Sequence, residues 1–299
     1  MTSPKPLTLR ILAGLFLFLV LAGYLGHVHP IGDTFAVFRL YFAGALALVG
    51  LAQLKAGVRN QGLINLGLGL GVIVMAGVLP FGRQITPPEG AQTITHYQKN
   101  VLYANDRPRE VLDDILARSP DVVTLQEAAG PSALILDALF DTYPTGLACD
   151  TPDTFGLAVF SSYPTVPGTE FCGTRIAGVQ VEGPDGPLWV ISIHLRWVYP
   201  YLNAFHVERL APELEALDGP KIIAGDFNVV PWAASVERVA EAGGVQRVGR
   251  ALVTFALAGV LRVQIDNILA TGGEGVTERL PRLGSDHWGV WAEYTMTGG

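Results

Sequence analysis

Residues 221–228 read Lys-Ile-Ile-Ala-Gly-Asp-Phe-Asn, and the fold can be worked out from this stretch. After Lys221 it continues as a short apolar run, which is typical of a buried strand, and it turns polar at Asp226 and Asn228. A carboxylate and an amide at the end of a rigid strand are held in fixed positions, so they can line a cleft. The stretch therefore predicts a functional site at a strand end of a layered domain.

The same change from apolar to polar recurs along the chain. It occurs at residues 126–127, 226–228 and 266–267 and, ahead of the last strand, at residues 284–287. One acid at a strand end is usually a cap or a turn residue. Four strand ends that combine acid, amide and imidazole groups are harder to explain as caps or turns alone. Hard oxygen ligands of this kind suit Mg²⁺ or Mn²⁺, so the sequence predicts a divalent-metal site.

Strands and helices alternate on both sides of this stretch. Helices are predicted over residues 108–118, 132–140, 204–217 and 235–242. Strands are predicted over residues 93–103, 121–126, 157–160, 179–181, 188–195, 221–224, 264–270 and 288–294. Strands mixed with helices in this way predict an α/β layered domain over residues 92–299.

The first third of the chain is apolar in a different way. Three runs, at about residues 9–25, 35–54 and 63–81, each approach the ~20 residues that a helix needs to cross a membrane. They are apolar on every face, which argues against a soluble bundle. A cleaved signal peptide is the alternative for the first run, but two more apolar runs follow it. We expect a membrane anchor of three helices over residues 1–83 and a linker over residues 84–91.

Basic residues in the short loops predict the orientation of this anchor. Lys5 precedes the first run and Arg10 lies at its start, and residues 55–59 place two more basic side chains between the second and third runs. Both segments therefore belong inside. Three crossings leave the C-terminal domain outside, so we expect a multi-pass protein of the inner (cytoplasmic) membrane whose domain faces the periplasm. Arg39 is expected to snorkel to the outer interface, or alternatively to bind an anionic head group.

Charge is divided unevenly along the chain. Residues 1–83 contain six Lys or Arg and one Asp. The remainder contains 14 basic and 26 acidic residues, a net charge of −12. An acidic domain is a poor match for a nucleic-acid backbone, whose binding relies on Lys and Arg.

The chain has two cysteines, Cys149 and Cys172, both in its acidic part. They show no metal-binding spacing, and the simpler interpretation is two buried thiols. A disulfide is chemically permitted if this part of the chain faces an oxidising compartment.

At six places the sequence resembles the endonuclease/exonuclease/phosphatase superfamily. The ordered segments are Lys99-Asn100-Val101, Leu125-Gln126-Glu127, His194-Leu195, Gly225-Asp226-Phe227-Asn228, Ile265-Asp266-Asn267 and Ser285-Asp286-His287. The resemblance covers about residues 92–296. Together with the apolar N-terminal runs, the chain resembles bacterial members of the superfamily that carry N-terminal membrane spans. The resemblance implies a four-layer α/β sandwich, with two mixed β-sheets flanked by helices. It also implies a phosphoester hydrolase with Mg²⁺ or Mn²⁺ as its cofactor.

The resemblance implies a metal site in this chain. Glu127 would be the main metal ligand, and Asn100 would help to orient the metal or the phosphate. Asp286 could assist the metal. The sequence departs from some family nucleases at Leu102, where they carry Asp, and at Asn267, where His or Tyr is frequent.

The resemblance also implies catalytic roles. Asp226 would align and deprotonate the attacking water, and Asn228 would donate a hydrogen bond to a phosphate oxygen. His287 would contact the phosphate or the developing charge, while Asp266 would bind the other imidazole nitrogen. His194 would be a second phosphate contact or a proton donor.

Three other polar side chains are assigned no chemistry. His96 is interpreted as structural. His206 and Arg209 share a helix face three residues apart, so a solvated surface pair is expected.

The expected substrate is a phosphoester, and fold does not choose between a lipid and a nucleic acid. The anchor, the outward topology and the acidic charge favour a lipid or a small extracytoplasmic phosphoester. Arg196 and the aromatic residues Trp197, Tyr199 and Tyr201 are expected to grip a membrane interface, to stack on a base, or to pack as a hydrophobic loop. An extracytoplasmic nuclease acting on DNA or RNA is the first alternative. An inactive membrane scaffold is the second, and the near-complete set of catalytic residue types argues against it.

Overall fold

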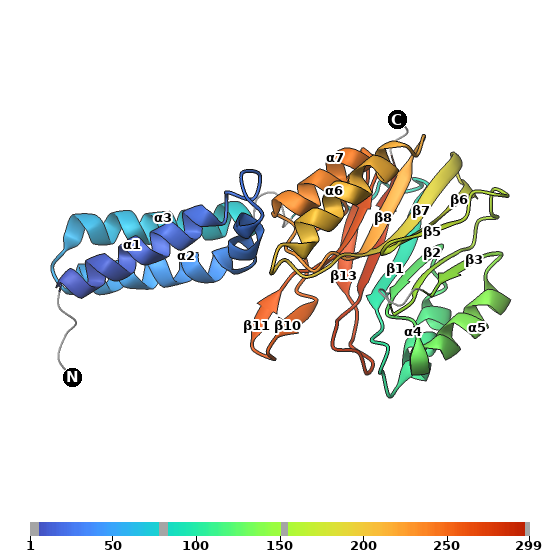
Figure 1. The fold of residues 1–299 in the computed structure, drawn as a ribbon, viewed down its shortest axis with the longest axis horizontal. Helices are drawn as coiled ribbons and strands as arrows, with labels where there is room; N and C mark the ends of the chain where they lie inside the picture. Colours follow the sequence, from blue (N-terminus) through green and yellow to red (C-terminus); the bar gives the residue numbers. More distant parts are fainter. Residues whose placement is uncertain (1–5, 78–82, 151–154, 297–299) are drawn as a thin grey trace.

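Two six-stranded sheets lie face to face in the C-terminal domain of the computed structural model, which describes residues 6–77, 83–150 and 155–296 (Figure 1). The first sheet has the strand order β13-β14-β1-β2-β4-β3, and the second has the order β5-β6-β7-β8-β12-β9. Strands β1 and β2 pair in parallel, as do β7 and β8, and the other neighbours are antiparallel. Both sheets are therefore mixed.

Short strands build both sheets. The first sheet contains β1 (Ile94–Asn100), β2 (Val122–Gln126), β3 (Thr145–Cys149), β4 (Leu157–Ser161), β13 (Glu274–Arg279) and β14 (Val290–Thr295). The second contains β5 (Phe171–Gly173), β6 (Ile176–Gly183), β7 (Gly186–His194), β8 (Lys221–Asp226), β9 (Gln246–Arg247) and β12 (Asp266–Ala270). A separate hairpin consists of β10 (Phe255–Leu257) and β11 (Leu261–Val263).

Helices cover the outer face of each sheet. The first sheet is covered by α4 (Pro108–Arg118), the 3₁₀ turn η1 (Gly130–Ser132) and α5 (Ala133–Thr142), and the second by α6 (Leu202–Glu215) and α7 (Ala234–Gly243). One buried apolar cluster lies between the sheets, and one lies between each sheet and its helices. The domain is therefore α/β, with two mixed sheets flanked by helices, as predicted.

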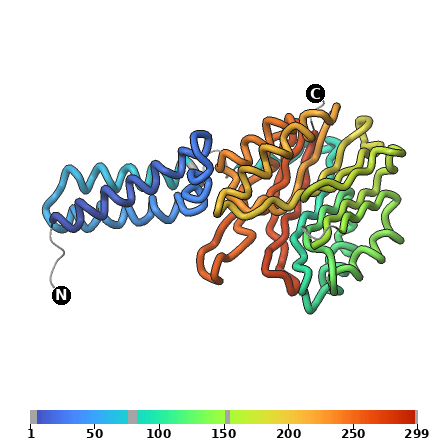
Figure 2. The backbone as a smooth tube through the Cα atoms, in the orientation of Figure 1, coloured from blue at the N-terminus to red at the C-terminus, as the bar shows by residue number. Residues whose placement is uncertain are grey.

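Three helices precede this domain and lie side by side (Figure 2). They are α1 (Pro6–Ala22), α2 (Ile31–Lys55) and α3 (Arg59–Gly77). Among the described residues, α2 alone is long and apolar enough to cross a membrane. The shorter α1 has 17 residues, and the predicted third run continues to residue 81, outside the described residues. The structure thus supports one candidate span where the sequence predicts three.

The start of α2 docks onto the C-terminal domain. Asp33 is buried and accepts hydrogen bonds from the backbone N–H groups of Ala234 and Ser235, at 2.9 and 3.0 Å, and from the Ser235 hydroxyl. A carboxylate is favourable there because these N–H groups begin α7 and have no partner within the helix. The indole of Trp232 donates to the carbonyl of Ala36 at 3.0 Å. Distant segments of the chain therefore form one packed interface.

Arg39 belongs to this interface, so the prediction that it snorkels or binds a head group is wrong. Its side chain is only 4% exposed and donates to the carbonyl of Gly23 at 3.2 Å. Its guanidinium lies 4.0 Å from the centre of the Tyr24 ring and 5.9 Å from that of Trp232. The aromatic faces stabilise the cation and keep it between the helices and the domain.

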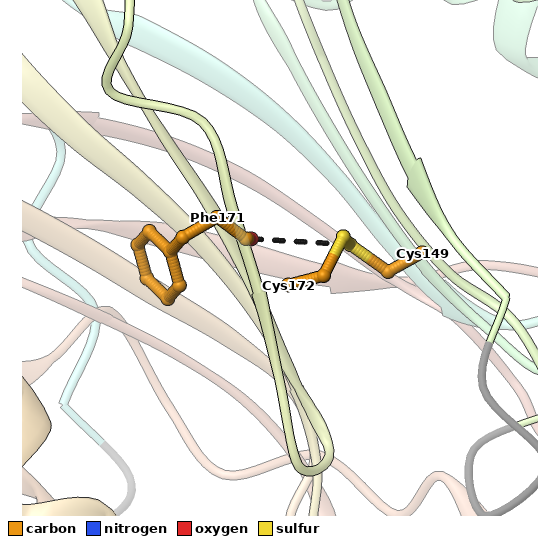
Figure 3. The surroundings of a disulfide bond; sticks show 3 residues. All are labelled: Cys149, Phe171 and Cys172. Carbon is orange, nitrogen blue, oxygen red and sulfur yellow. Dashed lines mark hydrogen bonds between the residues drawn. A yellow bond between two sulfur atoms is a disulfide. The ribbon is translucent and has the colours of Figure 1, made fainter.

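Cys149 and Cys172 are joined in a disulfide, so the expectation of two free thiols is wrong (Figure 3). The bond connects β3, at the edge of the first sheet, with β5, at the edge of the second. No local pattern in the sequence showed that these two edge strands meet. The bond therefore fastens the two sheets together at one end of their shared face.

Removing this disulfide is expected to lower the free energy of unfolding. The bond spans 23 residues of sequence, and a loop of this size corresponds to about 3 kcal/mol of stabilisation. The double variant Cys149→Ser/Cys172→Ser, compared with the wild type by denaturant unfolding of the full chain in detergent, should show this loss. Reduced wild type is the control and should match the variant. Equal stability of the oxidised wild type and the variant would contradict a structural bond.

His96 is expected to make stability depend on pH. It is fully buried between Thr124 and Tyr294, and burial lowers the pKa of His96 to about 3. The unfolded chain binds a proton below about pH 6.5, which the folded chain excludes, so stability falls as pH drops from there towards 3. The loss amounts to about 2 kcal/mol at a pH of about 5. Thermal unfolding at neutral and acidic pH should show a smaller decrease for His96→Gln, and an equal decrease would refute this role.

Candidate active site

Strand register brings the predicted catalytic residues together. Asp226, the last residue of β8, pairs directly with His194 at the end of β7 and with Asp266 at the start of β12. In the first sheet, Asn100 ends β1, and Glu127 follows the end of the parallel neighbour β2. The facing sheets therefore deliver carboxylates, an amide and an imidazole to one edge of the sandwich.

Gly225 allows this close approach of β7 and β8. Its φ is +154°, and a Cβ atom built at this position would overlap the backbone oxygen of Ile193. A larger residue would therefore push β8 away from β7 and move Asp226 away from His194.

Asp226 is the centre of the cluster. Its side chain accepts hydrogen bonds from the Asn100 amide at 3.2 Å and from the Asn228 amide at 3.3 Å. The Nε2 atoms of His194 and His287 lie 3.6 and 3.7 Å from its Oδ2. Burial raises the pKa of Asp226 to about 7, although the charge of His287 opposes this effect. The residue is thus a carboxylate of increased basicity that is surrounded by donors.

His287 and Asp266 form a buried pair. The Nδ1 atom of His287 lies 2.9 Å from Oδ2 of Asp266, so Nδ1 donates and Nε2 faces Asp226. Burial alone would disfavour the charged imidazole. The carboxylates of Asp266 and Asp226 overcome this effect and raise the pKa of His287 to about 9. His287 is therefore held as a cation at neutral pH.

Glu127 lies at the open side of the cluster, with its side chain 17% exposed. Its Oε1 accepts a hydrogen bond from the Asn100 amide at 3.1 Å, and its Oε2 accepts one from the backbone N–H of Tyr103 at 3.4 Å. Glu127 and Asn228 both have positive φ, +55° and +52°, which is unfavourable for Glu and is tolerated better by Asn. Such conformations concentrate at functional sites, where the surrounding structure enforces them.

The donor chemistry of the cluster fits a hard divalent cation. The Glu127 carboxylate is partly open to solvent and offers oxygen ligands. Asp226, Asp266 and His287 form a buried group whose candidate ligand atoms lie within 4.8 Å of one another, and because His287 is held as a cation, the two carboxylates of the group are the oxygen donors. The structure is thus compatible with the predicted metal at this edge of the sheets.

Two further residues, Asn100 and Asp286, were predicted to contribute to the metal site, and the structure places them differently. Asn100 accepts a hydrogen bond from the Leu102 N–H on its amide oxygen, so its amide nitrogen faces Glu127 and Asp226. In this orientation Asn100 positions carboxylates. Asp286 is exposed, and its role toward a metal stays a prediction.

No role was assigned from the sequence to the buried polar side chains behind the site. Gln98 donates to Asp266 at 3.2 Å and to Gln126 at 2.7 Å. Gln126 donates in turn to the hydroxyl of Ser192 at 3.0 Å. Alternation in the strand is the signal that could have found them: Gln98 lies two residues before Asn100 and so shares its face of β1.

Lys99 belongs to the first of the six segments, but no role was assigned to it from the sequence. It is fully buried and points to the other face of β1, where its Nζ donates to the carbonyls of Pro281 at 2.9 Å and His287 at 3.2 Å. Burial lowers the pKa of Lys99 to about 8, against the opposing charge of Asp266. The ammonium group fastens the loop that carries His287.

The two side chains predicted as a surface pair lie outside this cluster. His206 is buried, with its Nε2 atom 2.8 Å from the carbonyl oxygen of Thr174, so the prediction that it is solvated is wrong. Arg209 is exposed, as predicted. The aromatic run has mixed surroundings: Trp197 packs against the apolar core, Tyr199 is exposed, and the Tyr201 ring meets His29 edge-on at 5.5 Å. Tyr201 therefore contacts the loop between α1 and α2.

Fold and cluster together define a hydrolase that acts on phosphoester bonds. The chain belongs to the Endonuclease/Exonuclease/phosphatase family, whose sequence model matches residues 97–287. This family depends on divalent metals, and the acidic cluster agrees with that requirement. The comparison with curated proteins gives no match.

Solved structures share the fold at low sequence identity. TDP2 from D. rerio, complexed with a single-strand DNA product, has a TM-score of 0.56 and 18% identity over 69% of this chain and 100% of that chain. Sphingomyelinase C from Streptomyces griseocarneus has a TM-score of 0.53 and 18% identity, with the same coverage of 69% and 100%. The endonuclease/exonuclease/phosphatase from Bacteroides vulgatus has a TM-score of 0.55 and 15% identity, again over 69% and 100%. At these identities the likeness concerns the fold.

Proposed function

We propose that the protein is a membrane-anchored phosphoesterase that hydrolyses a lipid or small phosphoester outside the cytoplasm, with Mg²⁺ or Mn²⁺ as its cofactor. The convergence of polar side chains on Asp226 carries this proposal. Two of its neighbours are imidazoles and two are amides, which are the groups needed to hold a phosphate and a water molecule.

In this proposal the residues around Asp226 share the work of hydrolysis. Asp226 aligns the attacking water and accepts its proton, and burial supports this role by raising its pKa. Asn228 donates a hydrogen bond to a phosphate oxygen. His287, held as a cation by Asp266, contacts the charge that develops on the phosphate. His194 provides a second contact from the end of β7 or donates a proton.

Glu127 would hold the metal, and Asn100 would orient its carboxylate through the hydrogen bond at 3.1 Å. Asp286, two residues after the Gly284 turn, is the further predicted contributor. A bound divalent cation would neutralise phosphate charge and stabilise the leaving oxygen.

The proposed anchor comprises residues 1–83 with three membrane spans, followed by a linker at residues 84–91 and the catalytic domain at residues 92–299. Helix α2 supports the anchor by its length and hydropathy. The basic loops favour an inner-membrane protein with its domain in the periplasm. A disulfide between Cys149 and Cys172 agrees with an oxidising compartment.

A nuclease is the second candidate function. The fold is similar to that of TDP2 from D. rerio complexed with single-strand DNA product, and nuclease chemistry would use the same cluster. The net charge of −12 in residues 84–299 favours the lipid or small phosphoester. An inactive scaffold is disfavoured, because the carboxylates, amides and imidazoles of the cluster are all present.

The test is hydrolysis by the full chain in detergent with Mg²⁺ or Mn²⁺. The panel contains bis-p-nitrophenyl phosphate, plasmid DNA, RNA, sphingomyelin and phosphoinositides, and His287→Ala is the inactive control. Metal-dependent turnover of the soluble ester and a lipid supports the proposal, whereas preference for DNA or RNA selects the nuclease. Absence of both turnover and calorimetric metal binding would favour the scaffold.

A further inference from the structure

The β10–β11 hairpin, residues 255–263, is unusually apolar for an exposed element. Its nine residues include one charged side chain, Arg262. The three residues of its turn, Ala258 to Val260, are all exposed, and Val260 is 76% exposed. Single exposed apolar residues are normal on protein surfaces. An apolar hairpin that extends from the domain is a liability unless another surface covers it.

The hairpin extends on the side of the helical bundle, and it contacts the candidate membrane span (Figure 1). The hydroxyl of Tyr41 in α2 donates to the carbonyl of Arg262 at 2.8 Å. Tyr41 lies about 21 Å along the helix from Lys55, while the hydrocarbon core is about 30 Å thick. With Lys55 at the inner boundary, the contact lies within the outer leaflet, where the long Arg262 side chain can reach the phosphate head groups.

The base of the same hairpin forms a wall of the active site. The ring of Phe255 lies 4.8 Å from the imidazole of His287. Just before it, the hydroxyl of Thr254 accepts hydrogen bonds from the N–H groups of Ile265, at 3.3 Å, and Asp266, at 3.1 Å. The hairpin therefore connects the catalytic pair with the surface of α2 over only a few residues.

We propose that the β10–β11 hairpin is seated in the outer leaflet of the bilayer and delivers a lipid-borne phosphoester from that surface to the active site. The occupant of the apolar hairpin is thus a lipid surface, continuous with the one around α2. The docking of Asp33 on α7 and of Trp232 on Ala36 fixes the domain at the height that this contact requires. The inference deepens the proposed function and rests on it for the orientation of the anchor.

The first test places a fluorescent label in the hairpin. Both native cysteines are in the disulfide, so Val260→Cys introduces a single reactive thiol. The full chain is labelled with the NBD fluorophore at this position and placed in nanodiscs of phosphatidylcholine and phosphatidylglycerol. A fraction of the phosphatidylcholine carries a spin label on its acyl chain, which quenches a fluorophore that lies in the bilayer. Leu116→Cys is the matched control, because it is an exposed apolar position on α4, and α4 lies on the side of the domain away from the helical bundle. We expect blue-shifted emission at Val260→Cys and quenching about fivefold stronger than at Leu116→Cys.

The second test separates lipid delivery from chemistry. Val260→Glu should lower hydrolysis of phosphoesters in phosphatidylglycerol vesicles about tenfold and change hydrolysis of soluble bis-p-nitrophenyl phosphate less than about twofold. Leu116→Glu should alter neither rate. Equal quenching at the two labelled positions, or an equal loss on both substrates, would overturn the proposal. If the wild type hydrolyses no phosphoester, the proposed function fails, and the quenching result still decides whether the hairpin lies in the bilayer.

Discussion

Asp226→Asn is expected to lower kcat by about 10³-fold, with a much smaller change in KM. The amide has the shape of the carboxylate, so its oxygen can keep the two contacts of Oδ2 with the Asn100 and Asn228 side chains, but it cannot accept the proton of the attacking water. Rates measured with bis-p-nitrophenyl phosphate at saturating Mg²⁺ test this expectation. Asp113→Asn, on the exposed face of α4, is the matched control and should keep the wild-type rate.

The same substitution separates catalysis from stability. Burial raises the pKa of Asp226, so ionised Asp226 is unfavourable in the folded chain. Asp226→Asn should therefore keep or raise Tm while activity falls, as is common at active sites. A variant that retains more than about a tenth of the wild-type kcat would remove Asp226 from the role of base.

Glu127→Gln is expected to raise the Mg²⁺ concentration for half-maximal activity by more than about 100-fold, because the amide lacks the charge that binds the cation. Groups that only orient a metal ligand change affinity by about 10–100-fold when they are replaced. Asn100→Ala should therefore show a smaller effect, since Asn100 supports the Glu127 carboxylate through a hydrogen bond. Isothermal titration calorimetry with Mn²⁺ measures directly which of the two variants binds the metal more weakly. Weaker binding in Asn100→Ala than in Glu127→Gln would assign the ligand role to Asn100.

The catalytic residues at strand ends could be predicted because their signal is local. Glu127 and Asp226 each follow a short apolar run, and the structure shows both runs as buried strands that end at the cluster. Helix α4 could be predicted for the same reason, since Val111 and Ile115 repeat at helical spacing and are buried. Strands such as β3 and β9 were missed because they are short or only partly buried, and their pairing partners determine them.

Contacts between distant segments could not be predicted. Asp33 and Ser235 are separated by 202 residues, and neither carries a local sign of the other. Arg39 was predicted to snorkel or to bind a head group, and His206 to be solvated, because their own helices suggest it. In the structure both are buried, Arg39 with its guanidinium bonded to Gly23 and His206 with its imidazole against Thr174. The disulfide likewise depends on two edge strands of different sheets.

The most direct test of a metal-dependent phosphoesterase centred on Asp226 is hydrolysis of bis-p-nitrophenyl phosphate by the full chain in detergent, with and without a chelator. We predict turnover that requires Mg²⁺ or Mn²⁺, stops when EDTA is added, returns when the metal is restored, and falls about 10³-fold in Asp226→Asn. Turnover that persists in EDTA, or that Asp226→Asn retains at the wild-type rate, would contradict this account of the site.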